Sequence, residues 1–228
     1  MKTRLSRRLS VLAEMLPDTE ALADIGTDHG GLLSYLVETG RVRRGIGVEI
    51  TRGPYLRATT NINAMGYGDR VEIRLGDGLA PIGPGEVSAC AIAGLGGQTI
   101  VRILDRSPEV AAGLDWLLLQ PMTGAKTVRI YLQLNGWTIY REALAEDRGI
   151  IYEIILARRG ETGPLSPLEA EFGPMILAER PPLFKQAVKR KILGLRDIVE
   201  QLEKSDSAES ADRKGLLRER IREWEALI

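Results

Sequence analysis

The sequence predicts an α/β fold built on a mostly parallel sheet, followed by a helical hairpin. Three observations support this prediction. Short apolar runs alternate with helical segments through much of the chain, two β-rich runs then follow each other directly, and the last part shows only helical periodicity. Strands that alternate with helices form parallel sheets, whereas consecutive strands joined by a short turn pair antiparallel.

The first elements are a helix, a strand and a second helix. Leucines recur at helical spacing over residues 4–15, and Pro17 ends this basic amphipathic helix. The apolar run over residues 21–25 is the first expected strand. The next helix is expected over residues 32–38, because apolar pairs fall on one face, and Gly40 stops it.

The second and third strands enclose another helix. Residues 45–48 form a short apolar run with Glu49 at its carboxyl end. Pro54 is well placed to start a helix that stops at Gly66, since proline favours the first helical turn and glycine the end. Residues 71–75 alternate between polar and apolar side chains, as a third strand does.

The fourth and fifth strands are expected over residues 87–92 and 117–119, where apolar residues run together. The fourth leads into the glycine-rich run 93–97 and a helix that contains the apolar residues of 100–104. The fifth leads into a helix over residues 126–134. Each strand is therefore followed by a helix, as in a parallel sheet.

Two β-rich runs, 137–143 and 150–157, are joined by the polar segment 146–149 and are expected to form a hairpin. Five strands that alternate with helices and then an antiparallel pair make up the Rossmann-like seven-stranded sheet of S-adenosylmethionine-dependent methyltransferases. The turn-rich link 160–167 then changes the character of the chain. We expect a methyltransferase-type domain over 1–160 and a second domain over 161–228.

The second domain is expected to be an antiparallel, coiled-coil-like helical hairpin. One narrow apolar stripe runs from Phe184 to Leu202 and a second from Leu217 to Ile228, separated by the polar break 205–210. Packing between the helices is the default role of such stripes. A contact with RNA or a partner is the alternative, through Lys185, Lys189, Arg190 and Lys191.

The composition of the chain argues against some classes of function. The chain has 228 residues, with 31 basic and 31 acidic side chains, and this zero net charge argues against a protein that coats nucleic acid non-specifically. Arginines gather around Arg4 to Arg8 and Arg41 to Arg44, which indicates a local basic face or only a solvated surface. The single cysteine, Cys90, excludes an internal disulfide. Apolar runs are short and no signal peptide is recognisable, so a cytoplasmic location is expected.

The loop Asp24-Ile25-Gly26-Thr27-Asp28-His29-Gly30 lies where α/β proteins hold nucleotide-like ligands. A dinucleotide site would have Gly-x-Gly-x-x-Gly here, and a pyrophosphate would meet two carboxylates instead. Carboxylates suit a ligand with a cationic end and sugar hydroxyls, such as S-adenosylmethionine. An acidic turn without a ligand is the alternative.

Further candidate residues follow the other strands. Glu49 is placed to accept hydrogen bonds from ribose hydroxyls, and Asp77 between two glycines is placed to take an adenine amino group. The run 93–97 is placed to receive a flat base beside the methyl group, or is a plain tight turn. The acids can also be caps or turn formers, and His29 can orient a ligand or make a structural hydrogen bond.

With these residues in place, the whole chain resembles the bacterial tRNA (adenine-22, N1)-methyltransferase family. The matching segments are Leu5-Ser6-Arg7-Arg8-Leu9, Asp24-Ile25-Gly26-Thr27-Asp28-His29, Gly53-Pro54, Arg74-Leu75-Gly76-Asp77-Gly78-Leu79, Ile92-Ala93-Gly94-Leu95-Gly96-Gly97, Leu119-Gln120-Pro121, Tyr152-Glu153-Ile154-Ile155 and Phe172-Gly173-Pro174. The family usually has Ser at Thr27, often Met at Leu95, and Ala-Tyr-Leu-Pro where this chain has Gly30-Gly31-Leu32-Leu33.

The resemblance implies methyl transfer from S-adenosylmethionine to N1 of adenine 22 in tRNA, by an enzyme that needs no metal and acts as a monomer. The target base must be exposed or pulled from its stack. The expected cofactor-binding residues are Asp24, Gly26, Thr27, Asp28, His29, Gly30, Glu49, Ile50, Gly76, Asp77, Gly78, Ala93 and Gly94. The expected substrate-binding residues are Arg7, Arg8, Leu95, Gly96, Gly97, Gln120 and Pro121. Asp77 is the candidate catalytic residue, as adenine contact or proton acceptor.

Other function classes stay open at this point. A methyltransferase of another RNA position or of a small molecule would keep the same cofactor site. A non-catalytic RNA-binding scaffold on the same fold would bind tRNA without methyl transfer. A nicotinamide-dependent oxidoreductase would place its pyrophosphate against Asp24 and Asp28, and it would not need the closing hairpin.

Overall fold

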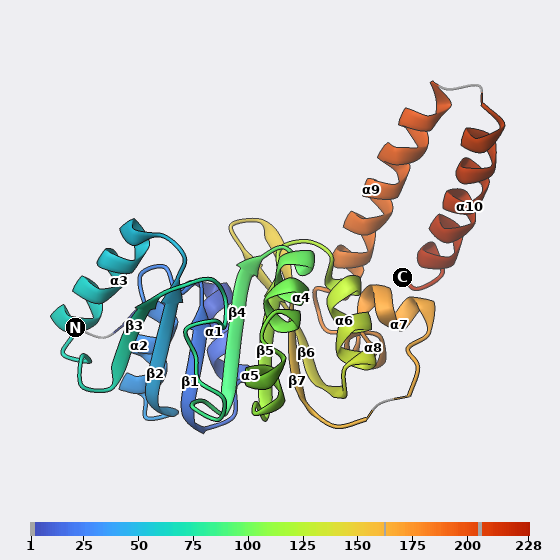
Figure 1. The fold of residues 1–228 in the computed structure, drawn as a ribbon. Coiled ribbons are helices and arrows are strands. Elements are labelled where there is room, and N and C mark those ends of the chain that lie inside the picture. Colours follow the sequence, from blue (N-terminus) through green and yellow to red (C-terminus); the bar gives the residue numbers. More distant parts are fainter. Residues whose placement is uncertain (1–2, 162, 205–206) are drawn as a thin grey trace. The chain divides into compact units, whose positions relative to one another are not determined.

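A seven-stranded sheet organises the larger part of the chain (Figure 1). Its strand order is β3-β2-β1-β4-β5-β7-β6, with β1 to β5 parallel and β7 and β6 antiparallel. The strands are β1 (Thr19–Ile25), β2 (Val42–Glu49), β3 (Val71–Leu75), β4 (Ala89–Leu95), β5 (Trp116–Pro121), β6 (Trp137–Asp147) and β7 (Ile150–Arg159). The predicted Rossmann-like sheet is confirmed.

The computed structural model describes residues 3–161, 163–204 and 207–228. Its helices are α1 (Arg7–Met15), α2 (Gly31–Glu38), α3 (Arg52–Ala64), α4 (Gly97–Asp105), α5 (Pro108–Ala112), α6 (Ala125–Leu134), α7 (Pro167–Phe172), α8 (Pro174–Glu179), α9 (Phe184–Glu203) and α10 (Ala208–Glu225). No helix within the described residues combines the length and the apolar character that a membrane span requires.

Several element ends differ from the prediction for local reasons. Helix α1 starts at Arg7 because the Ser6 hydroxyl accepts a hydrogen bond from the Leu9 N–H and caps the helix. Strand β4 starts later than expected and runs on to Leu95, with a register irregularity at its glycine-containing end. Strand β6 extends to Asp147, because Arg148 and Gly149 alone make the turn, both with positive φ.

The two faces of the sheet bury separate apolar cores. Helices α1 and α2, with Ile62 of α3, cover one face, where Leu22, Leu118 and Ile154 point. Helices α4, α5 and α6 cover the other face, which includes the buried Cys90. Burial raises the pKa of the Cys90 thiol, so this cysteine is a core residue, as expected for its small apolar neighbours.

The chain divides into two compact units, Met1–Leu177 and Ala178–Ile228, and the first unit includes residues 161–177, beyond the stretch predicted as the methyltransferase-type domain. A buried ion network explains why. Arg129 of α6 is fully buried, and its guanidinium donates to Glu142 at 2.7 Å and to Glu153 at 2.6 Å. It also donates to the carbonyl oxygens of Ala170 and Glu171 in α7, at 3.3 and 3.1 Å, and so joins α7 to the sheet.

The helices α5, α7 and α8 are absent from the prediction. Each of them is short, so periodicity alone does not reveal it. For α7 a local signal exists, because Ser166 and Glu169 form a reciprocal capping box around Pro167. The segment predicted only as a turn-rich link therefore ends in a helix.

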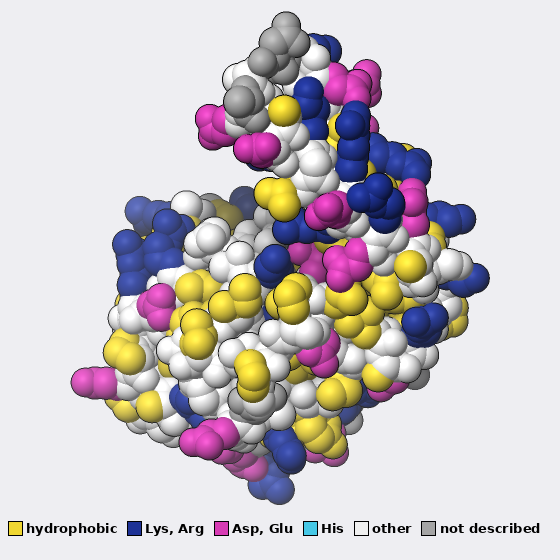
Figure 2. Space-filling view, turned by 90° about the vertical axis from the view of Figure 1, so that its right-hand side faces the viewer, with side chains coloured by type: hydrophobic (Ala, Val, Ile, Leu, Met, Phe, Trp, Pro, Cys, Tyr) yellow, Lys and Arg dark blue, Asp and Glu magenta, His cyan; other side chains and the backbone are white. Residues whose placement is uncertain are grey.

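The second unit is the predicted antiparallel helix pair. Helices α9 and α10 pack against each other, with Val199 and Ile221 buried, whereas Ile198 is exposed. Ion pairs join Arg196 to Glu225 at 2.6 Å and Arg218 to Glu203 at 2.9 Å. Figure 2 shows Lys and Arg side chains intermixed with Asp and Glu side chains on this unit. Within the predicted polar break, residues 205–206 lie outside the described residues, and Ser207 caps α10.

Candidate functional site

The parallel strands β1 to β4 end at one edge of the sheet, and the predicted acids gather there. Asp24 lies near the end of β1 and Glu49 ends the neighbouring strand β2. Asp77 follows β3, and Gly94 lies near the end of β4. Strand β1 is flanked by β2 on one side and β4 on the other, so the order of connections reverses at its end. Open α/β sheets bind ligands at such a switch point.

Asp24 is a buried carboxylate at the centre of this edge. The Thr27 hydroxyl, which is also buried, donates to Asp24 Oδ2 at 2.8 Å. Burial raises the pKa of Asp24 to about 6, Glu49 adds to the increase, and Thr27 and Arg8 oppose it. At neutral pH the carboxylate is therefore ionised and can hold a cation.

Glu49 is joined to the glycine loop after β1. Its Oε1 accepts a hydrogen bond from the Asp28 N–H at 2.5 Å, and the Asp28 backbone is left-handed with φ of 55°. Glu49 Oε2 makes no hydrogen bond to any described residue, so it remains available for a ligand hydroxyl. The exposed Ile50 follows directly and offers an apolar surface beside it.

The glycines of the loop keep the edge open. Gly26 has φ of 75°, and a Cβ built on it would have no described atom within 4 Å. Gly30, with φ of 72°, precedes α2, and a Cβ there would lie 3.0 Å from Ile62. A side chain is therefore disfavoured at both positions by the backbone, and at Gly30 also by space.

Gly47 of β2 is a site-supporting residue whose role the sequence reasoning missed. A Cβ at Gly47 would lie 2.6 Å from Ile73 and 2.8 Å from the Thr27 methyl group. The missing side chain therefore lets Thr27 pack onto β2 and point its hydroxyl at Asp24. The sequence signal for this role is a glycine inside an apolar strand, which often marks a place where another group packs closely against the backbone.

His29 and Asp28 lie on the outer side of the loop, and both side chains are exposed. The ring Nε2 of His29 is 3.6 Å from Asp28 Oδ1. His29 also lines a shallow cavity of about 490 Å³ together with Leu56, Arg57, Thr60 and Asn61 of α3. The role predicted for His29 in orienting a ligand remains a prediction.

Asp77 lies at the end of the outer strand β3, two strands away from β1. Its exposed carboxylate pairs with Arg106 at 3.1 Å, a partner that the sequence analysis did not identify. The Gly76 N–H donates to the Glu49 carbonyl at 2.9 Å and keeps this turn beside β2. Gly78 has φ of 59° and packs against Ile103.

Arg8 reaches the same edge from helix α1. Its Nη1 donates to Oε1 of the buried Gln120, and its guanidinium lies 5.4 Å from the centre of the Tyr152 ring. Gln120 Oε1 also accepts from the Gly94 N–H at 3.2 Å. Arg7 is exposed instead, so the two neighbouring arginines, predicted as equivalent substrate contacts, have different surroundings.

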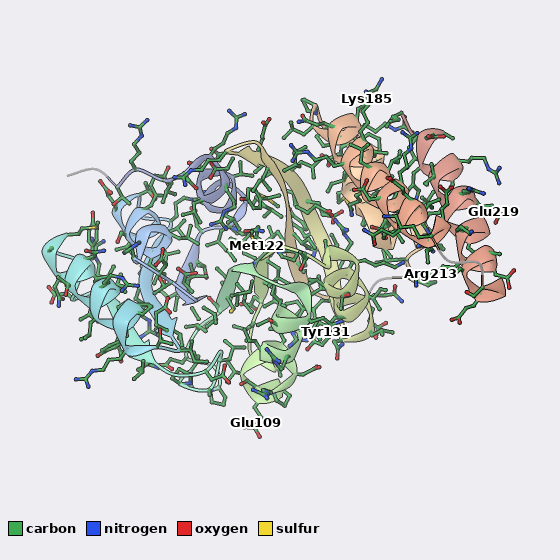
Figure 3. The ribbon with its side chains drawn as sticks, turned by 90° about the horizontal axis from the view of Figure 1, so that it is seen from above. Glu109, Met122, Tyr131, Lys185, Arg213 and Glu219 are labelled. Atoms are coloured by element: carbon green, nitrogen blue, oxygen red, sulfur yellow. The ribbon has the colours of Figure 1, made fainter. Side chains whose placement is uncertain are left out.

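Three of the residues predicted to bind the substrate are buried. They support the sheet edge and have no exposed surface for a ligand to contact. Gln120 and Pro121 are buried in β5. Gly97 is also buried, and a Cβ there would collide with the backbone of Gly124. Leu95, Gly96 and Ala93 are partly exposed. The exposed Met122, labelled in the view of this edge from above (Figure 3), donates its N–H to the Leu95 carbonyl at 2.8 Å.

A second cavity, of about 330 Å³, lies beside the amino-terminal halves of β2 and β3, away from this edge. Arg74 lines it, but its guanidinium is already paired with Glu72 and Glu86 at 2.8 and 2.6 Å. The Arg74 hydrogen bond holds the pKa of Glu86 at about 2. The charged side chains Glu72, Arg74 and Glu86 that line this cavity are therefore already paired with one another. Among the described residues, no three His, Cys, Asp or Glu side chains are grouped as a metal site, and the expected absence of a metal remains a prediction.

Comparisons with a family model and with known proteins identify the same family. A model of the tRNA (adenine(22)-N(1))-methyltransferase family matches residues 22–226. The tRNA (adenine(22)-N(1))-methyltransferase of Bacillus subtilis (strain 168) is 32% identical over 231 residues, which covers 96% of this chain and 97% of the relative.

Solved structures agree over the full length. The crystal structure of the B. subtilis m1A22 tRNA methyltransferase TrmK superposes with a TM-score of 0.91 at 29% identity, and 100% of each chain is covered. Streptococcus pneumoniae Sp1610, solved in complex with S-adenosyl-L-methionine, superposes with a TM-score of 0.88 at 31% identity. That comparison covers 98% of this chain and 99% of the other.

Proposed function

This chain belongs to the tRNA (adenine(22)-N(1))-methyltransferase family, and from this membership we propose how its residues transfer a methyl group from S-adenosylmethionine to N1 of adenine 22 in tRNA. One observation supports the proposal most strongly. Two buried carboxylates, Asp24 and Glu49, end adjacent strands beside a glycine loop that leaves open space. This donor set fits a ligand that carries an ammonium group and ribose hydroxyls.

Each acid has a separate role in holding the cofactor. Asp24, oriented by Thr27, binds the ammonium group, and Glu49 Oε2 accepts a hydrogen bond from the ribose. Asp77 contacts the adenine amino group. The strand order favours this role over that of a proton acceptor, because β3 is the outer strand and β4 lies beyond both β2 and β1. When bound, S-adenosylmethionine supplies a methyl carbon attached to a positively charged sulfur.

The acceptor side of the site lies at the end of β4. The positive φ of Gly94 and the register irregularity between Ala93 and Leu95 turn the backbone away from the sheet and leave room for a flat base. Leu95 and the exposed Met122 provide apolar contacts for that base. Since a ring nitrogen attacks the methyl carbon directly, alignment of base and cofactor is the main task of these residues.

Recognition of tRNA requires positive charge outside the pocket. The exposed Arg7, at the start of α1 and next to the site-facing Arg8, is placed to contact a phosphate. We expect the enzyme to act as a monomer, without a metal ion, in the cytoplasm where its substrate is found.

Methyl transfer can be tested directly. The purified protein is incubated with S-adenosylmethionine that carries a labelled methyl group and with unmodified bulk tRNA, and the digested nucleosides are identified by mass spectrometry. We expect the label in 1-methyladenosine. Label in a different nucleoside, or cofactor binding without any methyl transfer to tRNA, would contradict the proposed function.

A further inference from the structure

We propose that helix α3 and the His29 side chain form a binding surface for the RNA strand that flanks the target adenine. On this surface Arg57 binds a phosphate, and His29 and Leu56 contact a base. The inference rests on the proposed function, because it assigns residues outside the cofactor pocket to the same RNA substrate. It also changes the role expected for His29 from the sequence, which was contact with the cofactor.

Helix α3 borders the candidate site directly. Strand β2 ends at Glu49 and α3 starts at Arg52, so the first turn of this helix lies beside the carboxyl edge of the sheet. The Asn61 side chain donates to the His29 carbonyl oxygen at 3.4 Å, which ties the glycine loop after β1 to the helix. Figure 1 shows α3 beside β2 and β3, the two strands that it contacts. The surface of α3 is therefore continuous with the glycine loop.

Helical periodicity brings the residues of this surface together. Leu56 and Thr60 are four residues apart, as are Arg57 and Asn61, so the two pairs form adjacent rows on α3. Ile62 of the same helix is buried in the core instead. Together with His29, the four residues of the two rows line the shallow cavity of about 490 Å³.

This cavity offers the chemical groups that a nucleotide needs. Its volume falls in the range of about 300–1,000 Å³ that is usual for pockets of small ligands. Leu56 is 49% exposed and offers an apolar surface, and the exposed His29 ring offers a flat one. The Thr60 hydroxyl donates to the Leu56 carbonyl oxygen at 2.9 Å, so its own oxygen can still accept a hydrogen bond from a base. A base can therefore stack here, as the bases of single strands do on other proteins.

The charge of α3 favours an anionic partner. Residues 52–64 include two arginines and no acidic residue, although the whole chain has equal numbers of basic and acidic side chains. Arg52 and Arg57 are exposed, and neither side chain forms an ion pair or a hydrogen bond within the described residues. The Asp28 carboxylate, 3.6 Å from His29 Nε2, does not line the cavity. The two guanidinium groups are therefore available for the phosphates of a nucleic acid.

The head group of Arg57 lies toward the candidate site. A Cβ built on Gly53 would lie 3.5 Å from Arg57 Nη1, so the guanidinium extends back along α3 toward its start, as long helical side chains do. The start of α3 is the end that follows Glu49. Neighbouring strands lie about 4.8 Å apart, so the ends of β2 and β4, with β1 between them, are separated by about 10 Å. A phosphate at Arg57 therefore belongs to a nucleotide close to an adenine bound at the end of β4.

The test measures the binding of tRNA and of the cofactor separately. Binding of a tRNA transcript with adenine at position 22, in the presence of S-adenosylhomocysteine, is measured by fluorescence anisotropy at several salt concentrations. The proteins are the wild type, Arg57→Gln, His29→Ala and the control Arg43→Gln. Arg43 is an exposed arginine paired with Glu20 at 3.3 Å. Calorimetry measures the binding of S-adenosylmethionine to the same four proteins without tRNA.

The two variants should weaken tRNA binding in different ways. Arg57→Gln should raise the Kd about ten-fold at low salt and lower the slope of log Kd against log salt by about one, because one phosphate contact is lost. His29→Ala should raise the Kd roughly five- to ten-fold without changing the slope, because stacking releases no counterions. Neither variant should change cofactor affinity more than about two-fold, and Arg43→Gln should change nothing. In transcripts that carry one neutral methylphosphonate, a position close to adenine 22 should remove the difference between the wild type and Arg57→Gln.

Three results would overturn the inference. Equal tRNA binding by Arg57→Gln and Arg43→Gln would show that α3 does not contact the RNA. A loss of cofactor affinity in His29→Ala would return His29 to the cofactor site. A methylphosphonate effect found only far from adenine 22 would place a different part of the RNA on α3. Failure of the proposed function is distinguishable, because it would appear as wild-type protein that binds the cofactor and does not methylate tRNA.

Discussion

Replacing Asp24 by asparagine should stabilise the ligand-free protein at neutral pH and weaken its binding of the cofactor. Asp24 is buried at the sheet edge, and burial raises its pKa from the ordinary 3.8 to about 6. Asparagine has a similar shape, and its side-chain oxygen can still accept the hydrogen bond from Thr27. The substitution therefore removes a buried negative charge and preserves the local packing.

The size of the effect follows from linkage between protonation and folding. Because the pKa of Asp24 is higher in the folded than in the unfolded protein, ionisation destabilises the fold as the pH rises from 3.8 to about 6, and the full penalty applies above pH 6. At 1.36 kcal/mol per pKa unit the penalty is about 3 kcal/mol at pH 8, an upper limit on the gain. At pH 5 the same relation gives a penalty of about 1.6 kcal/mol. The stability gained by Asp24→Asn should therefore be roughly half of its value at pH 8.

Urea unfolding at pH 5 and pH 8, followed by circular dichroism, measures this difference. The control is Asp18→Asn, which removes an exposed carboxylate paired with Arg41 and should change stability by less than about 1 kcal/mol. Calorimetry should show at least a roughly ten-fold loss of cofactor affinity in Asp24→Asn. A variant that is less stable than the wild type at pH 8, or equally stabilised at both pH values, would refute the reasoning.

Three further predictions concern other parts of the structure. Glu49→Gln should weaken binding of S-adenosylmethionine about ten-fold in calorimetry, because an amide replaces the charged acceptor of the ribose hydroxyls, and unchanged affinity would remove Glu49 from the cofactor site. Arg129→Met should lower the free energy of unfolding by about 3–5 kcal/mol in urea titrations, because Glu142 and Glu153 lose their partner in a buried site, and a loss below about 1 kcal/mol would contradict this. Arg7→Glu should raise the KM for tRNA at low salt, less so at high salt, and leave cofactor affinity unchanged; equal KM values would exclude a phosphate contact.

The gathering of the candidate acids at one edge of the sheet could be predicted from the sequence, because the signals for it are topological. Asp24, Glu49 and Asp77 each follow an apolar strand, and parallel strands end at one edge whatever the details of packing. The glycine loop and the closing hairpin could also be predicted, because both depend on local sequence. The strand order itself, which separates Asp77 from the end of β4, required the structure.

The roles that sequence could not assign depend on which way a side chain points. Arg7 and Arg8 are neighbours in one basic cluster, yet helical geometry turns only Arg8 toward Gln120. Gln120 was expected to meet the substrate, but it is buried, because it shares its face of β5 with the core residue Leu118. The contacts of Arg129 with Ala170 and Glu171 could not be predicted for a similar reason, since they join residues far apart in the sequence.

The target nucleotide is the most direct test of the whole account. Two transcripts of one tRNA, with adenine or guanine at position 22, are incubated with the protein and S-adenosylmethionine carrying a labelled methyl group, and the modified nucleoside and its position are read by mass spectrometry. We predict one methyl group per adenine-22 transcript, recovered as 1-methyladenosine at that position, and no label in the guanine-22 transcript. Equal labelling of both transcripts, or a methyl group on any other atom, would contradict the assignment of this site to N1 of adenine 22.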